Sequence, residues 1–260
     1  MSGVWGAVDV GNTSIHIGLF AAEDSRPLPM PTQTFSTSSA EPDFAALINL
    51  LPQQPIDWHV VSVNRPGQAA FEAWRKQARS GDSCHVLTHA DLPLEVAVAA
   101  PEKVGMDRLA AAVGANAIRQ PQRPAIIIDA GSAITVDLVA VDGSFLGGAI
   151  VPGMKMAARA LAGQTDLLPE ITVDVGEVPA AIGTDTLAAM RSGLYFSAVG
   201  GVRELIARFT AQLAGPTPQV IFAGGDAAKL APQMSLECVT IDHLVLGGVA
   251  IAARTAKATR

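Results

Sequence analysis

The chain carries Asp9-Val-Gly-Asn-Thr-Ser-Ile15 near its N-terminus and Asp129-Ala-Gly-Ser-Ala-Ile-Thr135 at its middle. Each stretch sets a carboxylate, a small residue, a glycine and a short polar residue between two apolar runs, which is typical of a tight β-hairpin. The two stretches start 120 positions apart in a chain of 260 residues. This spacing predicts a duplicated domain with an acidic hairpin in each half and a nucleotide cleft between the halves.

The composition argues against nucleic acid or a membrane as the partner. Hydrophobic residues make up 49% of the chain and its formal net charge is −6. No run or stripe of Lys and Arg is visible, whereas nucleic acids and anionic membranes require clustered basic residues. Cys84 and Cys238 have neither metal-type nor disulfide-type spacing. Without a signal-like N-terminus or an apolar run of about 18 residues, we expect a cytoplasmic protein.

Apolar periodicity and turn residues predict alternating strands and helices. The expected strands are Val4–Val10, Ile15–Phe20, Trp58–Val63, His85–Leu87, Ala125–Asp129, Ile134–Val141, Phe145–Val151 and Val220–Ala223. The expected helices are Phe44–Leu51, Ala69–Arg79, Asp107–Ile118, Met154–Ala162, Thr186–Phe209 (kinked or broken at its glycines) and Leu246–Ala256. This order predicts an α/β fold with mixed sheets. The proline-flanked stretch Gln120–Pro124 is the expected joint between domains at residues 1–119 and 120–260.

The first hairpin is a candidate phosphate site. Consecutive backbone amides in a Gly-Asn-Thr turn form a nest suited to phosphate oxygens. Asp9 could hold Mg²⁺ through water, because Mg²⁺ keeps much of its hydration and binds few carboxylates. The alternative is an ordinary hairpin with an Asp at its mouth, and the matching second hairpin favours the phosphate site.

Gly105-Met106-Asp107-Arg108 precedes an alanine-rich helix. Asp107 falls in the first turn, where the helix dipole favours an anion, although an Asp there can simply cap the helix. The neighbouring Arg108 offers a fork able to grip a carboxylate or phosphate. Together the two side chains are typical of a base and a substrate clamp.

Two further glycine turns lead into helices. They are Gly183-Thr-Asp-Thr186 and Gly224-Gly-Asp226. Helix N-termini of this kind can contact anions or nucleotides, but they are also normal connectors.

In this order, the motifs resemble those of type III pantothenate kinases, members of the acetate kinase, sugar kinase, Hsp70 and actin superfamily. The resemblance runs from Asp9 to about Gly248 and includes Pro101–Arg108, Asp129–Asp137 and Gly147–Gly153. The Gly-x-Asp-Arg element is its specific part, because actin-like relatives lack it. The resemblance implies two similar ribonuclease-H-like (actin-like) domains, with mixed sheets flanked by helices and a cleft between the domains.

The resemblance also implies ATP-dependent phosphorylation of pantothenate to 4′-phosphopantothenate, with Mg-ATP and a monovalent cation (K⁺ or NH₄⁺). Asp107 resembles the general base, and Asp129 the ligand of the monovalent cation. The ATP contacts would be Asp9, Val10, Gly11, Asn12, Thr13, Ser14, Ile15, His16 and Ser132. The substrate contacts would be Val98, Gly105, Met106, Asp107, Arg108 and Thr186. The resemblance further implies a homodimer whose pantothenate site is completed across the interface, as in the family.

Two positions depart from the family's pattern. Val98 stands where a pocket tyrosine is common, and Asp185 where asparagine is more usual. Val98 raises the alternative of a kinase for another small hydroxy acid. A second alternative is a catalytically weak regulatory homologue, acting for instance in transcription. The intact set of Asp9, Asp107, Arg108 and Asp129, together with the missing basic patch, favours the kinase.

Overall fold

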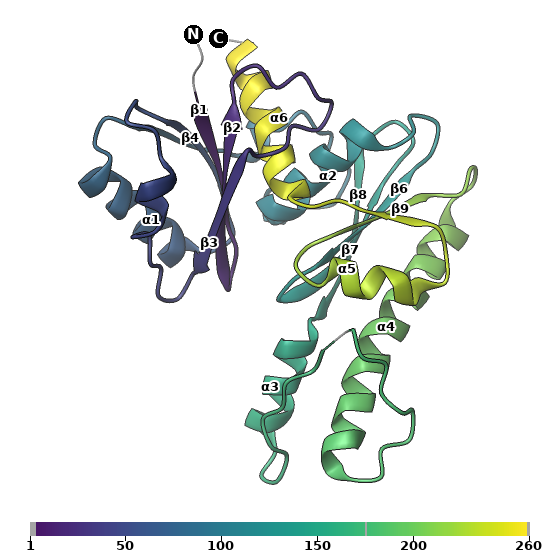
Figure 1. Cartoon of the computed structure of the whole chain (residues 1–260). Coiled ribbons are helices and arrows are strands. Elements are labelled where there is room, and N and C mark those ends of the chain that lie inside the picture. Colours follow the sequence, from purple (N-terminus) through teal and green to yellow (C-terminus); the bar gives the residue numbers. More distant parts are fainter. Residues whose placement is uncertain (1–3, 175, 259–260) are drawn as a thin grey trace. The chain divides into compact units, whose positions relative to one another are not determined.

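Figure 1 shows a computed structural model, which describes residues 4–174 and 176–258. The chain forms two compact units. The first contains the residues up to Arg119, the segment Gly143–Phe145 and the C-terminal segment from His243. The second contains Gln120–Asp142 and Leu146–Asp242.

The first unit is built on a five-stranded sheet in the order β3-β2-β1-β4-β5. The antiparallel hairpin of β1 and β2 continues in β3, while β4 and β5 run parallel to β1. Because strand side chains alternate between faces, Val8, Val60 and Trp58 share one face and pack against Phe71 of α1. The strands are β1 (Val4–Val10), β2 (Ser14–Ala21), β3 (Gln33–Ser38), β4 (Asp57–Ser62) and β5 (Ser83–Val86).

Helices flank this sheet. They are α1 (Arg65–Ala78), α2 (Met106–Ile118) and α6 (Leu244–Ala258), with short 3₁₀ turns η1 (Leu47–Leu50), η2 (His89–Asp91) and η3 (Pro101–Lys103). Helices α2 and α6 pack closely through small residues. A Cβ atom on Gly248 would meet the carbonyl oxygen of Ala110, and one on Gly114 the carbonyl of Leu244.

The second unit repeats this sheet in the order β10-β9-β6-β7-β8. Strands β6 and β7 form the antiparallel hairpin, and β9 and β10 follow in parallel. The strands are β6 (Ala125–Ala130), β7 (Ala133–Val139), β8 (Phe145–Pro152), β9 (Gln219–Ala223) and β10 (Cys238–Thr240). The first residue of β8, Phe145, belongs to the first unit. The helices are α3 (Met154–Gln164), α4 (Thr186–Gln212), α5 (Ala227–Leu230) and the 3₁₀ turn η4 (Ala231–Met234). Ile128 and Phe222 form its core with Tyr195 and Val202 of α4.

The predicted α/β fold with two mixed sheets and a hairpin in each half is confirmed. Both sheets place the hairpin and its parallel neighbour in the same order, which is the ribonuclease-H-like arrangement. The division at residues 119 and 120 stays a prediction. The C-terminal helix, expected with residues 120–260, packs in the first unit.

One element prediction was wrong, and another was wrong in part. The segment Phe44–Leu51 forms only the 3₁₀ turn η1, with Pro42 and Pro52 limiting a helix on either side. Helix α4 is one continuous helix, so it is not broken at its three glycines, while a kink there stays a prediction. Glycine costs about 1 kcal/mol relative to alanine in a helix, and the buried residues of α4 offset that cost. No helix within residues 4–174 and 176–258 is both long and apolar enough to cross a membrane.

Candidate functional site

The turn between β1 and β2 is held through its carbonyl groups. The Gly11 amide donates to the Ser14 carbonyl at 2.9 Å and closes the turn. The buried Ser39 hydroxyl donates to the Gly11 carbonyl at 2.7 Å, and its amide donates to the Thr13 carbonyl at 3.0 Å. These bonds fix the loop at the mouth of the hairpin, where Asn12 and Thr13 are exposed.

Asn64 links the same loop to helix α1. Its side-chain amide donates to the Asn12 carbonyl at 3.3 Å, while its oxygen accepts from the Gly67 amide at 2.9 Å. Asn64 therefore caps helix α1 and at the same time holds the β1–β2 loop through the Asn12 carbonyl. Sequence reasoning missed both Asn64 and Ser39. An available signal was the Asn-Arg-Pro-Gly run after β4, an N-cap followed by proline in the first turn.

Asp9 and His16 stand opposite each other on β1 and β2. Asp9 is half-buried. Desolvation lowers the pKa of His16, and the charge of His243, just before α6, lowers it further. Both effects favour the neutral form of His16.

Asp107 lies in the first turn of α2, whose N-cap is Gly105. Its Oδ1 atom accepts from the Arg108 amide at 2.8 Å. A Cβ atom on Gly105 would lie 2.5 Å from this oxygen and 3.3 Å from Val63, so a larger residue there would displace the carboxylate from this position. The Val63 amide in turn donates to the Val10 carbonyl at 3.0 Å. Asp107 and the β1–β2 hairpin thus belong to one unit, and Val63 lies close to Gly105 while bonding to Val10.

The second hairpin has equally tight surroundings. A Cβ atom on Gly224 would lie 2.3 Å from Oδ1 of Asp129, at a backbone φ of +90° that favours glycine. The Gly153 amide donates to the Ser132 carbonyl at 3.1 Å, at the start of α3. Asp129 and Ser132 are therefore enclosed by two glycine segments of the second unit.

A cation at Asp129 fits the groups around it. Thr135 pairs directly with Asp129 in the hairpin register, so the two side chains share one face. The Thr135 Oγ1 atom is buried and has no hydrogen-bond partner among the described residues. A hydroxyl and a carboxylate oxygen are suitable ligands for a hard cation.

The remaining predicted residues are placed as follows. Val98 is half-buried, and Met106 is buried at the start of α2. Thr186 is exposed at the first turn of α4, and Asp185 caps that helix by accepting from the Ala188 amide at 2.9 Å. An asparagine would cap it equally well.

The predicted residues are divided between the two units. The first unit holds the loop Asp9–His16, Val98 and Gly105–Arg108, and the second holds Asp129, Ser132 and Thr186. Over the described part of the chain, no three His, Cys, Asp or Glu side chains are arranged to hold a metal ion.

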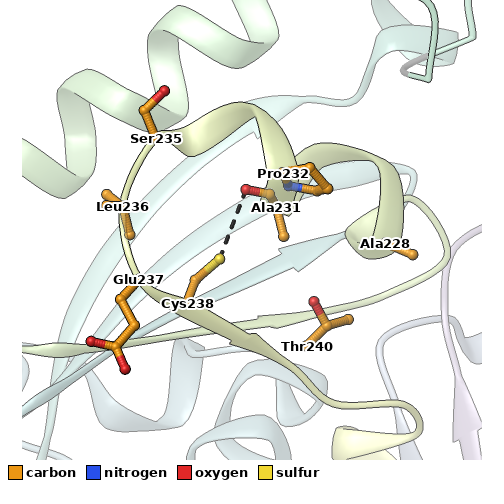
Figure 2. A pocket seen from close by; sticks show the side chains of 8 residues that line it. All are labelled: Ala228, Ala231, Pro232, Ser235, Leu236, Glu237, Cys238 and Thr240. Atoms are coloured by element: carbon orange, nitrogen blue, oxygen red, sulfur yellow. Dashed lines mark hydrogen bonds between the residues drawn. The ribbon is translucent and has the colours of Figure 1, made fainter.

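A cavity of about 730 Å³ in the second unit lies apart from these residues. Figure 2 shows it beside β10, lined by Glu237 and Cys238, with the Cys238 thiol 3.8 Å from the Ala231 carbonyl. Burial raises the pKa of this thiol. No predicted site residue lines the cavity.

Comparison with known proteins finds similarity to the type III pantothenate kinases. The profile described as type III pantothenate kinase matches residues 7–208. A type III pantothenate kinase of Endomicrobium trichonymphae is 32% identical over 94% of this chain and 96% of its own length. That of Rhodopirellula baltica is 39% identical, over 61% of this chain and 58% of its own length. A solved Campylobacter jejuni protein, assigned to the Baf family of transcriptional activators, shares the fold at a TM-score of 0.60 and 18% identity, covering 97% and 99% of the two chains.

Proposed function

The chain belongs to the type III pantothenate kinase family, and we propose that it transfers the γ-phosphoryl group of ATP to pantothenate. The product is 4′-phosphopantothenate, and the reaction is the first step of coenzyme A biosynthesis. The observation that carries the proposal is the family match over residues 7–208, which spans both acidic hairpins and the Gly105–Arg108 segment.

Asp107 is the proposed general base. Phosphoryl transfer passes through a loose transition state, so positioning and charge stabilisation dominate its catalysis. Asp107 is half-buried in the first turn of α2, and its Oδ1 atom is oriented by the Arg108 amide. From there it would accept the proton of the primary hydroxyl of pantothenate. The Arg108 guanidinium would grip the substrate's carboxylate as a fork.

The loop Asp9–His16 is the proposed phosphate cradle, and Ser132 a further contact with ATP. The hydrogen bonds from Ser39 and Asn64 support this role, because they hold the loop in one conformation before ATP arrives. Asp9 would hold Mg²⁺ through water, and Asp129 with Thr135 would hold K⁺ or NH₄⁺. When bound, these cations neutralise charge on the phosphates.

A homodimer is also proposed. Large apolar side chains are exposed on the second unit, among them Leu167 at 86%, Ile182 at 83% and Ile150 at 61%. They belong to β8 and to the segment between α3 and α4, two helices that lie side by side (Figure 1). Large apolar side chains left exposed on one unit are groups that a protein interface would cover. A second copy of this chain is the proposed partner, with Thr186 beside the same surface.

A substrate panel tests the proposal. Coupled ADP detection would be run with pantothenate and with other small hydroxy acids and alcohols, in K⁺, in NH₄⁺ and in a buffer holding neither. We expect turnover with pantothenate that disappears when both cations are removed. Turnover with another hydroxy acid alone would favour the alternative that Val98 raises. The absence of turnover with every substrate would favour a regulatory homologue.

A further inference from the structure

Phe145 lies against the guanidinium of Arg108 in the first unit. The Arg108 Cζ atom stands 5.6 Å from the centre of the Phe145 ring, which is within the range of a cation–π contact. The ring is 0% exposed. Because shielding from water strengthens such contacts, the buried ring is a firm platform for the arginine.

Hydrogen bonds fix the backbone on both sides of this ring. The Phe145 amide donates to the Glu95 carbonyl at 2.8 Å, and its carbonyl accepts from the Ala97 amide at 2.9 Å. Two residues earlier, the Asn116 side chain donates to the Gly143 carbonyl at 2.8 Å. Asn116 lies two turns beyond the arginine on α2, so the helix that carries the guanidinium also holds the segment that carries the ring.

The same ring connects two parts of the proposed substrate pocket. Residues 95–97, which pair with Phe145, lead directly into Val98. Arg108 comes from α2. Phe145 therefore contacts both segments that carry side chains proposed to line the pantothenate pocket.

We propose that Phe145 is a positioning residue for the kinase reaction. Its ring holds the Arg108 guanidinium in the orientation that grips the carboxylate of pantothenate, and the ring itself does not touch the substrate. This inference rests on the proposed function and deepens it.

Phe145→Leu removes the aromatic face and keeps most of the apolar volume. We expect the KM for pantothenate to rise about three- to tenfold, as the loss of one shielded cation–π contact implies. The kcat and the KM for ATP should stay close to those of the wild type, and Phe145→Tyr should restore the KM for pantothenate. The matched control is Phe71→Leu, which alters another fully buried ring of the same unit.

An unchanged KM for pantothenate in Phe145→Leu would overturn the inference, and so would an equal rise in Phe71→Leu. If the leucine variant does not fold, Phe145→Met gives the same test with a flexible apolar side chain. A wild-type chain that does not phosphorylate pantothenate would overturn the proposed function and this inference with it. Wild-type activity with no effect of the Phe145 variants overturns this inference alone.

Discussion

Asp107 is a half-buried carboxylate whose Oδ1 atom accepts from a neighbouring amide. Asp107→Asn keeps an acceptor at that position, so the variant should fold normally. It cannot accept the proton of the substrate hydroxyl, and we expect kcat to fall by at least about a hundredfold, the low end for a positioned base. Steady-state kinetics and thermal unfolding measure the two effects.

Asp43→Asn is the control for this variant. Asp43 is exposed in the same unit, and its carboxylate accepts from the Ala45 amide at 2.8 Å, which the side-chain oxygen of asparagine can also do. Turnover in Asp107→Asn at the level of this control would remove Asp107 from the mechanism.

The hydrogen bonds of the Asp24 carboxylate should make the stability of the fold depend on pH. Its carboxylate accepts from the Arg26 guanidinium at 2.6 and 2.9 Å and from the Met30 amide at 3.2 Å. The bonds from Arg26 hold the pKa of Asp24 well below its ordinary value. A carboxylate with a lowered native pKa stabilises the fold above its unfolded pKa of about 4, and the effect is lost as pH falls toward the native pKa.

Asp24→Asn should therefore lower the urea midpoint at pH 7, and its difference from the wild type should shrink below about pH 4. Urea unfolding at pH 7, 5, 4 and 3 measures this difference. A gap that stayed constant over the whole series would contradict the account.

Local residue patterns explain what the sequence could predict of the site. The Gly-Asn-Thr turn predicts the loop that follows Asp9. Pro101 and Gly105 mark the start of a helix, and they place Asp107 in its first turn. Ser39 and Asn64 were missed because their bonds to the loop join residues 28 and 52 positions apart. The contact between Arg108 and Phe145 likewise depends on tertiary packing.

At the scale of elements, the turn after β9 is shaped by its glycines. Gly224 has a φ of +90°, and a Cβ atom there would lie 2.3 Å from Oδ1 of Asp129 and 2.6 Å from the Ala130 carbonyl. Gly224→Ala combines a left-handed backbone penalty of about 1–2 kcal/mol with overpacking of about 1–3 kcal/mol. We expect unfolding free energy to fall by at least about 2 kcal/mol and the KM for ATP to rise.

Gly225→Ala provides a matched neighbour. A Cβ atom on Gly225 would point into open space, with no described atom beyond the adjacent residues within 4 Å, and its φ lies outside the left-handed region. Urea unfolding of the two variants should therefore separate them clearly. Equal unfolding free energies in the two variants would contradict the expectation that a side chain at position 224 clashes with Asp129.

Elements with strong periodicity were predicted well, and those fixed by their neighbours were not. Strands β1, β6 and β9 are continuous apolar runs, and their positions follow from burial on both faces. Strand β3 (Gln33–Ser38) is a polar edge strand with little burial, and it was not predicted because only its pairing with β2 defines it.

At the scale of the whole molecule, the exposed apolar residues of the second unit predict a dimer. Light scattering should give a mass twice the 26.8 kDa of the chain. Leu167→Glu combined with Ile182→Glu should shift the protein toward the monomer, because the two charges would be buried at the interface. Ile48→Glu, at a 40% exposed position of the first unit, is the control.

A monomeric wild-type chain would contradict the dimer, as would a double variant that remains dimeric. The sequence alone could not assign Leu167 and Ile182 to an interface. Their exposure depends on how the segment between α3 and α4 folds, and the sequence pattern does not show this.

The proposed phosphoryl transfer to pantothenate is tested most directly by ³¹P nuclear magnetic resonance of the wild-type chain with Mg-ATP, pantothenate and K⁺. The account predicts that ATP is consumed only when pantothenate is present, with equal amounts of ADP and 4′-phosphopantothenate formed. Hydrolysis to ADP and free phosphate, or no change in ATP when pantothenate is added, would contradict it.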